Sequence, residues 1–209
     1  MTNVTNYDTD SEDDTPKDIG DELYKELNDI VEKWCNNYEN NYSGGKMRQI
    51  RGADIEAFVQ SCINKIRDKY DDTIRCITGS ADKKTLLLSD ITKQHQVDIH
   101  IYKKDKFIAV IECKAYLDSC YYVRACDDFR LFKKCGYDVK SYIFTLENSI
   151  DKQTKDFTDA DTNSVCDNVF YMMDGKRSST KPIYNKKYKK TVNRESLLCF
   201  IESLKNVLI

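Results

Sequence analysis

Three polar side chains, Asp98, Glu112 and Lys114, interrupt segments that are otherwise apolar. Residues 97–102 alternate apolar and polar side chains, which predicts a half-buried strand with Asp98 in its middle. Residues 107–111 form a continuous apolar run, which predicts a strand buried on both faces that ends at Glu112 and Lys114. A short polar turn joins the two segments. The predicted β-hairpin would bring all three side chains to one edge of a sheet.

These residue types suit a divalent metal and a phosphate. Glu112 and Lys114 are two positions apart, so they point to the same face of a strand. Carboxylate oxygens are ligands that Mg²⁺ prefers, and Mg²⁺ keeps several waters besides. The metal would lower the pKa of a bound water, and the lysine would orient that water or stabilise charge at phosphorus. We therefore predict Asp98 and Glu112 as metal ligands, with the Cys113 carbonyl as a further candidate, and Lys114 as a catalytic residue.

The spacing of an acid and a lysine is by itself common in this chain. The acid-x-lysine triplet, in which an acid is followed two residues later by a lysine, occurs four times: at Asp82–Lys84, Glu112–Lys114, Asp138–Lys140 and Asp174–Lys176. Only the second closes an apolar strand that is expected to pair with a strand bearing an acid. The alternative is a structural ion pair between Lys114 and one of the carboxylates, because polar groups at the end of a buried strand need partners.

A basic segment near the C-terminus is a candidate nucleic-acid contact. Residues 174–194 hold eight basic side chains and one acid, with Tyr184 and Tyr188 between the lysines. Lysine, arginine and hydroxyl groups suit phosphate contact, whereas a solvated surface loop is the alternative. We take Arg177 as the candidate for reading a base. The predicted DNA-binding residues are Lys176, Arg177, Ser178, Lys181, Lys186, Lys187, Lys189 and Lys190.

Charge is divided unevenly along the chain. Residues 1–40 carry twelve acids and three lysines, a net charge of −9; the whole chain carries −2, so residues 41–209 carry +7. A basic body with an acidic arm fits a protein that binds a polyanion. Residues 1–18 are polar and acidic and are predicted to be disordered. This tail is either merely solvated or discourages nonspecific contact with nucleic acid.

Length and composition limit the class of protein. The chain has 209 residues, which predicts one domain over residues 19–209. It holds no apolar stretch long enough to span a membrane, so we expect no membrane association. Its first residues lack the basic and apolar regions of a signal peptide, so we expect an intracellular, non-secreted protein. Nine cysteines, an odd number, favour reduced thiols in a compartment such as the cytoplasm. The absence of any CxxC pair argues against a finger-type zinc site.

Helical spacing of apolar residues alternates with apolar runs along the chain, which predicts an α/β fold with a central mixed β-sheet flanked by helices. Residues 36–46 are predicted to form a non-helical segment between two helices, and residues 80–84 are predicted to form a turn. Gly136 is predicted to end a helix and Asn193 to cap one. Helices are expected at 21–35, 54–69, 121–135 and 194–208, and strands at 73–78, 97–102, 107–111, 141–146 and 169–173.

Asp98, then Glu112-x-Lys114 on an apolar strand, then a helix and a buried strand, resembles the PD-(D/E)XK nuclease superfamily. Residues 55–146 carry the resemblance. It implies a restriction-endonuclease-like fold and a metal-dependent deoxyribonuclease. Glu56 is similar to the acid that many members place on the helix before the sheet, where it acts as an outer metal or water ligand. Val97 stands where the family pattern has proline.

Within the superfamily the chain resembles type II restriction endonucleases. This implies sequence-specific cleavage of double-stranded DNA in restriction–modification, with Mg²⁺ as cofactor, Mn²⁺ able to substitute, and a homodimer matched to a palindromic site. The sequence leaves open a repair or recombination nuclease, such as a junction resolvase, and a catalytically silent DNA-binding module. Intact Asp98, Glu112 and Lys114 speak against the silent module.

Overall fold

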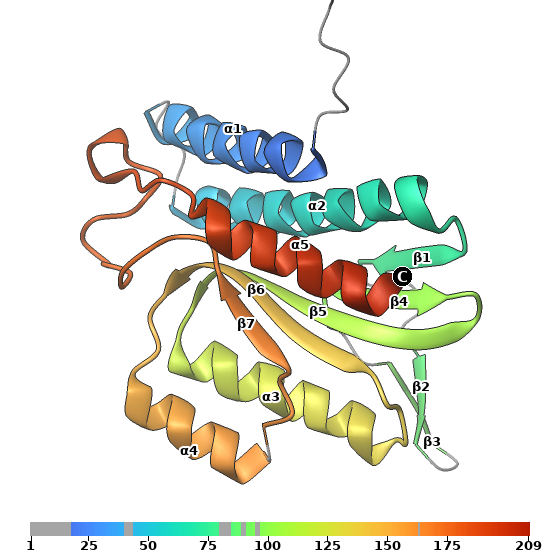
Figure 1. The fold of residues 1–209 in the computed structure, drawn as a ribbon. Coiled ribbons are helices and arrows are strands. Elements are labelled where there is room, and N and C mark those ends of the chain that lie inside the picture. Colours follow the sequence, from blue (N-terminus) through green and yellow to red (C-terminus); the bar gives the residue numbers. More distant parts are fainter. Residues whose placement is uncertain (1–17, 40–43, 80–84, 89–90, 95–96, 163) are drawn as a thin grey trace, which may run out of the picture.

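The protein has a central sheet with helices on both faces, as the α/β prediction requires (Figure 1). The computed structural model describes residues 18–39, 44–79, 85–88, 91–94, 97–162 and 164–209. The helices are α1 (Ile19–Glu39), α2 (Gly44–Tyr70), α3 (Ser119–Lys134), α4 (Lys152–Thr162) and α5 (Arg194–Leu208). The strands are β1 (Ile74–Thr78), β2 (Thr85–Leu88), β3 (Ile91–Gln94), β4 (Ile99–Lys103), β5 (Lys106–Leu117), β6 (Lys140–Asn148) and β7 (Asn168–Tyr171).

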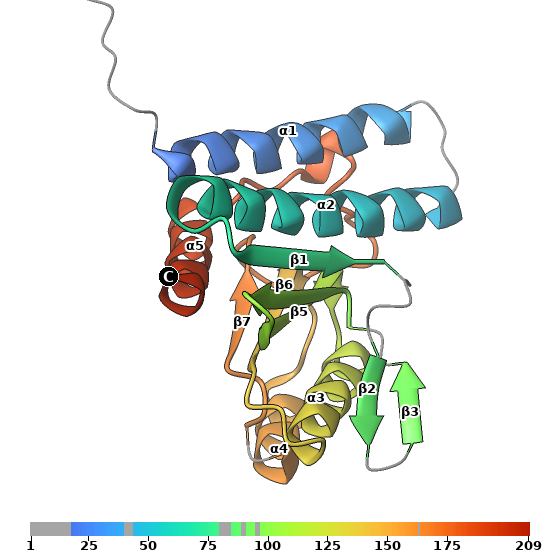
Figure 2. The ribbon, with the colours of Figure 1, turned by 90° about the vertical axis from the view of Figure 1, so that its right-hand side faces the viewer.

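The main sheet has five strands in the order β1-β4-β5-β6-β7. β1 pairs with β4, and β4 with β5, in antiparallel fashion, whereas β5–β6 and β6–β7 are parallel. The two parallel pairs are joined through α3 and α4, because parallel neighbours need a crossover connection. β2 and β3 form a separate two-stranded hairpin that stands apart from the main sheet (Figure 2).

Two apolar layers hold the sheet between the helices. α1, α2 and α5 cover one face, and α3 and α4 cover the other (Figures 1 and 2). Along β5, Ala109 and Ile111 belong to the first layer and Val110 to the second, and all three are fully buried. This explains the continuous apolar run of residues 107–111, since a strand covered on both faces needs apolar side chains at odd and even positions.

The two N-terminal helices are longer than the sequence pattern predicts. α1 continues to Glu39 and α2 starts at Gly44, so the predicted break at residues 36–46 is confined to the interval between them. Residues 40–43 lie outside the described part of the chain. Contacts with the C-terminal segment account for the extension: the Tyr38 ring lies 5.0 Å from that of Tyr184, and Met47 is fully buried. Such long-range contacts outweigh the local preference of the Asn- and Gly-rich sequence.

The remaining predicted elements are found with shifted ends. Asn193 caps α5 by accepting a hydrogen bond from the Ser196 backbone N–H, and Gly136 ends α3 with a φ of 80°. The prediction that Asp98 lies mid-strand is wrong, because β4 begins one residue later. β5 likewise does not end at Glu112–Lys114 but continues to Leu117. The β2–β3 hairpin was not predicted. The predicted turn at 80–84 and, except for its last residue, the acidic tail 1–18 lie outside the described residues.

Candidate functional site

Strand pairing brings Asp98 and Glu112 side by side. Ile99 at the start of β4 pairs with Ile111 on β5 in antiparallel fashion. Asp98, which precedes Ile99, therefore lies opposite Glu112, which follows Ile111. Val97, which precedes Asp98, is fully buried and anchors the chain where it enters the strand. Lys114 follows Glu112 by two positions on β5 and therefore shares its face of the sheet. The predicted cluster is thus assembled by two neighbouring strands.

Hydrogen bonds and ion pairs link the three side chains. Lys114 Nζ lies 2.5 Å from Glu112 Oε1 and 3.2 Å from Asp98 Oδ2. Asp98 Oδ2 also accepts a hydrogen bond from the Cys113 backbone N–H at 2.8 Å, and Glu112 Oε2 accepts one from the Asp98 backbone N–H at 3.3 Å. The side chains of Asp98 and Lys114 remain about one-fifth exposed, and that of Glu112 is 9% exposed. The cluster is therefore rigid yet open to solvent on one side.

Burial and charge act on Glu112 and Lys114 in opposite ways. Burial, together with the negative charge of Asp98, raises the pKa of Glu112, and Lys114 only partly offsets this rise. Burial alone would lower the pKa of Lys114, but attraction to Glu112 and Asp98 and the hydrogen bonds to them outweigh it and raise that pKa. Lys114 is therefore a permanent cation at neutral pH, whereas Glu112 takes up a proton at a higher pH than an exposed glutamate does.

The donor set fits a magnesium ion that keeps most of its water. Within the described residues no group of three or more His, Cys, Asp or Glu side chains comes together around one point. Asp98 and Glu112 are two hard oxygen donors, and Mg²⁺ is commonly held by one or two carboxylates plus substrate phosphates and water. The Lys114 ammonium stands between these carboxylates, so a metal must take over part of its interaction with them.

The structure places the two remaining predicted site residues on the opposite side of β5. The Cys113 side chain is buried in the layer beneath α1, α2 and α5. Burial raises the pKa of its thiol, and the carboxylates of Asp98, Glu112 and Glu56 add to the effect. Glu56, on α2, is thus close enough to act on Cys113. Its assignment as an outer metal ligand stays a prediction, as does that of the Cys113 carbonyl.

Three lysines of the basic segment, defined as residues 174–194, are paired with acids of the protein itself. Lys186 Nζ lies 2.8 Å from Glu39, and Lys189 forms an ion pair with Glu32, so both meet carboxylates of α1. Lys190 Nζ lies 3.1 Å from Glu147 Oε1 on β6. The exposed side chains of Lys176, Lys181 and Lys187 have no ion pair among the described residues. The segment therefore offers fewer available positive charges than its sequence implies.

The other predicted contacts of the basic segment also have defined positions. The Arg177 guanidinium carbon lies 3.8 Å from the centroid of the Tyr116 ring on β5, and its backbone N–H donates to the Asn148 carbonyl. Ser178 Oγ lies 3.2 Å from Thr180 Oγ1. Arg177 is thus held beside the strand that carries Glu112 and Lys114. Sequence reasoning missed Tyr116, Arg51 and Glu147 here; the two-residue step from Lys114 to Tyr116 was the one available signal.

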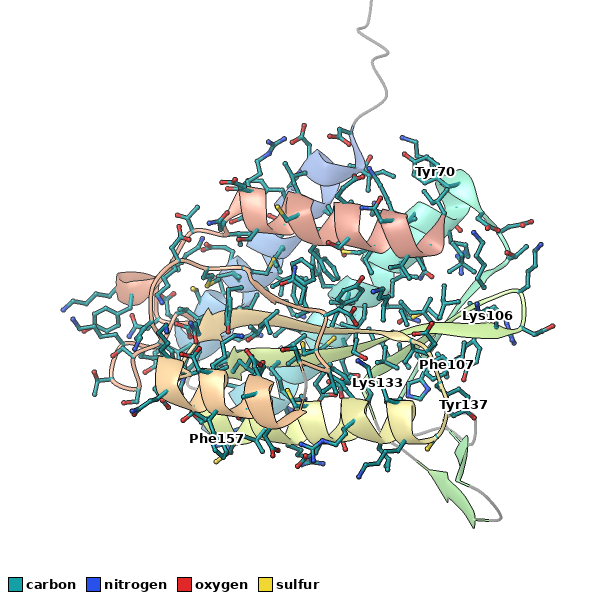
Figure 3. The ribbon with its side chains drawn as sticks, turned by 60° about the horizontal axis from the view of Figure 1, so that its bottom comes forward. Tyr70, Lys106, Phe107, Lys133, Tyr137 and Phe157 are labelled. Carbon is teal, nitrogen blue, oxygen red and sulfur yellow. The ribbon has the colours of Figure 1, made fainter. Side chains whose placement is uncertain are left out.

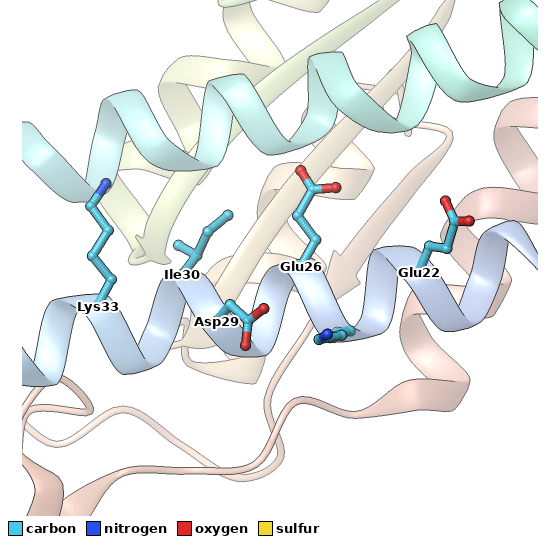
Figure 4. A pocket seen from close by; sticks show the side chains of 6 residues that line it. Glu22, Glu26, Asp29, Ile30 and Lys33 are labelled. Carbon is cyan, nitrogen blue, oxygen red and sulfur yellow. The ribbon is translucent and has the colours of Figure 1, made fainter.

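Hollows elsewhere on the surface lie apart from this cluster. A shallow cavity of about 420 Å³ follows α1, where Glu22 and Glu26 point toward α2 and bond to Lys65 and Ser61 (Figure 4). Another, of about 410 Å³, lies at the turn end of the β4–β5 hairpin, beside Phe107 and Tyr137 (Figure 3). Asp98 lies at the other end of that hairpin. Neither hollow is lined by Asp98, Glu112 or Lys114.

Comparison with protein-family models, with curated proteins and with solved structures finds no match for this chain. None of the helices in the described residues is both long and apolar enough to cross a membrane. Assignment of a function therefore depends on the geometry of the site itself.

Proposed function

We propose that the protein is a Mg²⁺-dependent endonuclease of double-stranded DNA with the restriction-endonuclease-like fold. The observation that carries this proposal is the contact of Asp98, Glu112 and Lys114 at one point of the sheet. Two observations support it further: the mixed sheet is antiparallel on one side of β5 and parallel on the other, and Arg177 lies beside the same strand. Mn²⁺ is expected to replace Mg²⁺, because it accepts the same oxygen ligands.

In this proposal each residue has one task. Asp98, which directly precedes β4, and Glu112 on β5 would hold Mg²⁺. The bound metal supplies an acidified water and offsets negative charge on the scissile phosphate. Lys114, released from part of its interaction with the carboxylates, donates a hydrogen bond to the attacking water or to a phosphate oxygen. Its ammonium stabilises the negative charge that develops when the water oxygen attacks phosphorus and the bond to the leaving oxygen breaks.

We propose a type II restriction endonuclease acting as a homodimer, in which each subunit cuts one strand of a palindromic site. The test is digestion of several unrelated plasmids and of a four-way DNA junction in Mg²⁺. Discrete plasmid fragments are the expected result. Cleavage of the junction alone would instead identify a junction resolvase. Binding without cleavage in either Mg²⁺ or Mn²⁺ would identify a silent DNA-binding module and contradict the proposed enzyme.

Mg²⁺ binding and DNA cleavage are expected to be lost as the pH is lowered, at a higher pH than if the ligand were an exposed glutamate. The cause is the raised pKa of Glu112, since a proton on this carboxyl competes with the metal. Activity is therefore present above this pKa and lost as the pH drops through it. Isothermal titration of Mg²⁺ between pH 4.5 and 8 measures the midpoint.

The variant Lys114→Ala provides the internal comparison for this pH dependence. Lys114 lowers the pKa of Glu112, so its removal should move the midpoint of Mg²⁺ binding to higher pH. A midpoint that stays in place, or one at the pH of an exposed glutamate in the unmodified protein, would show that Glu112 is not the titrating ligand.

The basic segment is expected to contribute to DNA binding through its lysines without ion pairs. Each lysine that neutralises a phosphate adds about 0.9 to the slope of log K against log salt on duplex DNA. The double variant Lys181→Ala/Lys187→Ala should flatten that slope, by up to about 1.8 if both make contact. The matched pair Lys186→Ala/Lys189→Ala should flatten it less, because Glu39 and Glu32 already neutralise these lysines.

Fluorescence anisotropy with a labelled duplex in Ca²⁺ measures both slopes without cleavage. A slope that Lys181→Ala/Lys187→Ala leaves unchanged would show that this part of the segment is only solvated surface. A larger effect of the ion-paired lysines would show that α1 releases them on binding.

A further inference from the structure

A second cluster of charged and aromatic side chains adjoins the carboxylate pair. Tyr116 follows Lys114 by two residues on β5, about 7 Å further along the strand. It pairs in register with Glu147 on the parallel strand β6. The basic segment passes this end of the sheet, where Lys176 forms an isolated parallel β-bridge with Asn148. The Arg177 backbone N–H donates a hydrogen bond to the Asn148 carbonyl at 2.7 Å. The backbone thus fixes Arg177 beside Tyr116.

Three cations and one buried carboxylate lie in this part of the molecule. The Arg177 guanidinium carbon lies 3.8 Å from the Tyr116 ring centroid, and Lys190 Nζ lies 3.1 Å from Glu147, which is 2% exposed. The third cation, Arg51 of α2, is 6% exposed and lies 4.6 Å from the centroid of the Tyr184 ring. Lys190 is already paired with Glu147, and neither guanidinium forms an ion pair with a carboxylate of the described residues.

The electrostatic effects within the cluster agree with an excess of positive charge. Burial lowers the pKa of Arg51, and the like charge of Arg177 lowers it further, whereas Tyr184, Glu147 and Tyr116 offset the shift only in part. Repulsion between two partly buried guanidinium groups is relieved when an anion binds near them. The cluster is therefore suited to an anionic ligand.

We propose that Arg177, stacked on Tyr116 and backed by Arg51, forms a binding site for a DNA backbone phosphate adjacent to the one at Asp98, Glu112 and Lys114. This inference rests on the proposed nuclease function and adds a positioning residue to it. The Arg177 guanidinium lies over the Tyr116 ring and has no ion pair among the described residues, which leaves N–H groups for hydrogen bonds to phosphate oxygens. The site lies on the same strand as the cluster, two residues beyond Lys114. Phosphate contact therefore suits Arg177 better than base reading.

The test is duplex binding by the intact chain in Ca²⁺, with Arg177→Ala and, as a matched control, Arg75→Ala. Arg75 is an exposed arginine of β1, paired with Asp105 near the turn of the β4–β5 hairpin. Arg177→Ala should lower the salt slope by about 0.9, with the same loss of affinity on three duplexes of unrelated sequence. Arg75→Ala should leave the slope unchanged. Tyr116→Phe, which keeps the ring, should bind as the unmodified protein does, and Tyr116→Leu more weakly.

Two results would overturn the inference: an unchanged slope for Arg177→Ala, or a loss of affinity confined to duplexes that share one base pair, which would mean base reading. Because binding is measured without cleavage, this test is independent of the proposed activity. Cleavage by the unmodified protein combined with an unchanged slope would reject the phosphate site and keep the nuclease. A lowered slope in a protein that cuts no DNA would reject the nuclease and keep the phosphate site.

Discussion

Asp98→Ala is expected to abolish DNA cleavage while DNA binding persists. Asp98 contributes one of the two carboxylates proposed for Mg²⁺, and the metal supplies several kcal/mol of stabilisation to the transition state. Since each 1.36 kcal/mol is a factor of ten, the loss should reach about 10³-fold or more. Binding should hold or tighten, because a negative charge near phosphates is removed. Cleavage rates on plasmid DNA and anisotropy with a labelled duplex measure the two effects.

Two further variants separate the charge of Asp98 from its structural role. Asp98→Asn can still accept the hydrogen bond from the Cys113 backbone N–H but carries no charge, so it should be as inactive as Asp98→Ala. Asp138→Asn changes the exposed acid of another acid-x-lysine triplet and should cut normally. Near-normal cleavage by Asp98→Asn would remove Asp98 from the metal site.

Lys114→Ala is expected to slow cleavage by about 10²–10³-fold, the range found when one donor to developing negative charge is removed. The ammonium lies 2.5 Å from Glu112 and 3.2 Å from Asp98, so it is close to both of the proposed metal ligands. An ammonium cannot ligate a metal, and Mg²⁺ binding above the pKa of Glu112 should therefore persist. Single-turnover cleavage rates at saturating Mg²⁺ isolate the chemical step from binding.

The competing interpretation of Lys114 is a purely structural ion pair. In that case Lys114→Ala would lower the melting temperature but leave the specific activity of the folded fraction unchanged. Lys140→Ala is the matched control, because Lys140 belongs to another such triplet and pairs with Asp167 on the surface. It should alter neither property appreciably, since exposed ion pairs contribute little to stability.

Local sequence patterns predicted the elements that carry the candidate site. The apolar run at 107–111 identified β5, because a strand covered on both faces must be apolar throughout. The acid-x-lysine triplet on that strand, together with Asp98 before β4, then predicted the three side chains that meet. The exact ends of the strands were less well predicted, since pairing with a neighbour, rather than the residue types, decides where a strand ends.

Features that depend on distant segments could not be predicted from local patterns. α2 begins ten residues before its predicted start because Met47 and Arg51 pack beneath the C-terminal segment. The cluster beyond Lys114 draws on Arg51, Tyr116, Glu147 and Arg177, which no spacing rule connects. In the same way, the pairing of Lys186 and Lys189 with α1 follows from packing. A count of basic residues therefore overstates the positive charge that is free of ion pairs in this segment.

The most direct test of the proposed enzyme is sequencing the DNA ends that the protein produces from plasmid DNA in Mg²⁺. The proposal predicts discrete ends at one recurring sequence, absent when the metal is chelated and absent with Asp98→Asn. No new ends in Mg²⁺ or Mn²⁺, or the same ends from Asp98→Asn, would contradict the assignment of Asp98, Glu112 and Lys114 as the active site of a DNA endonuclease.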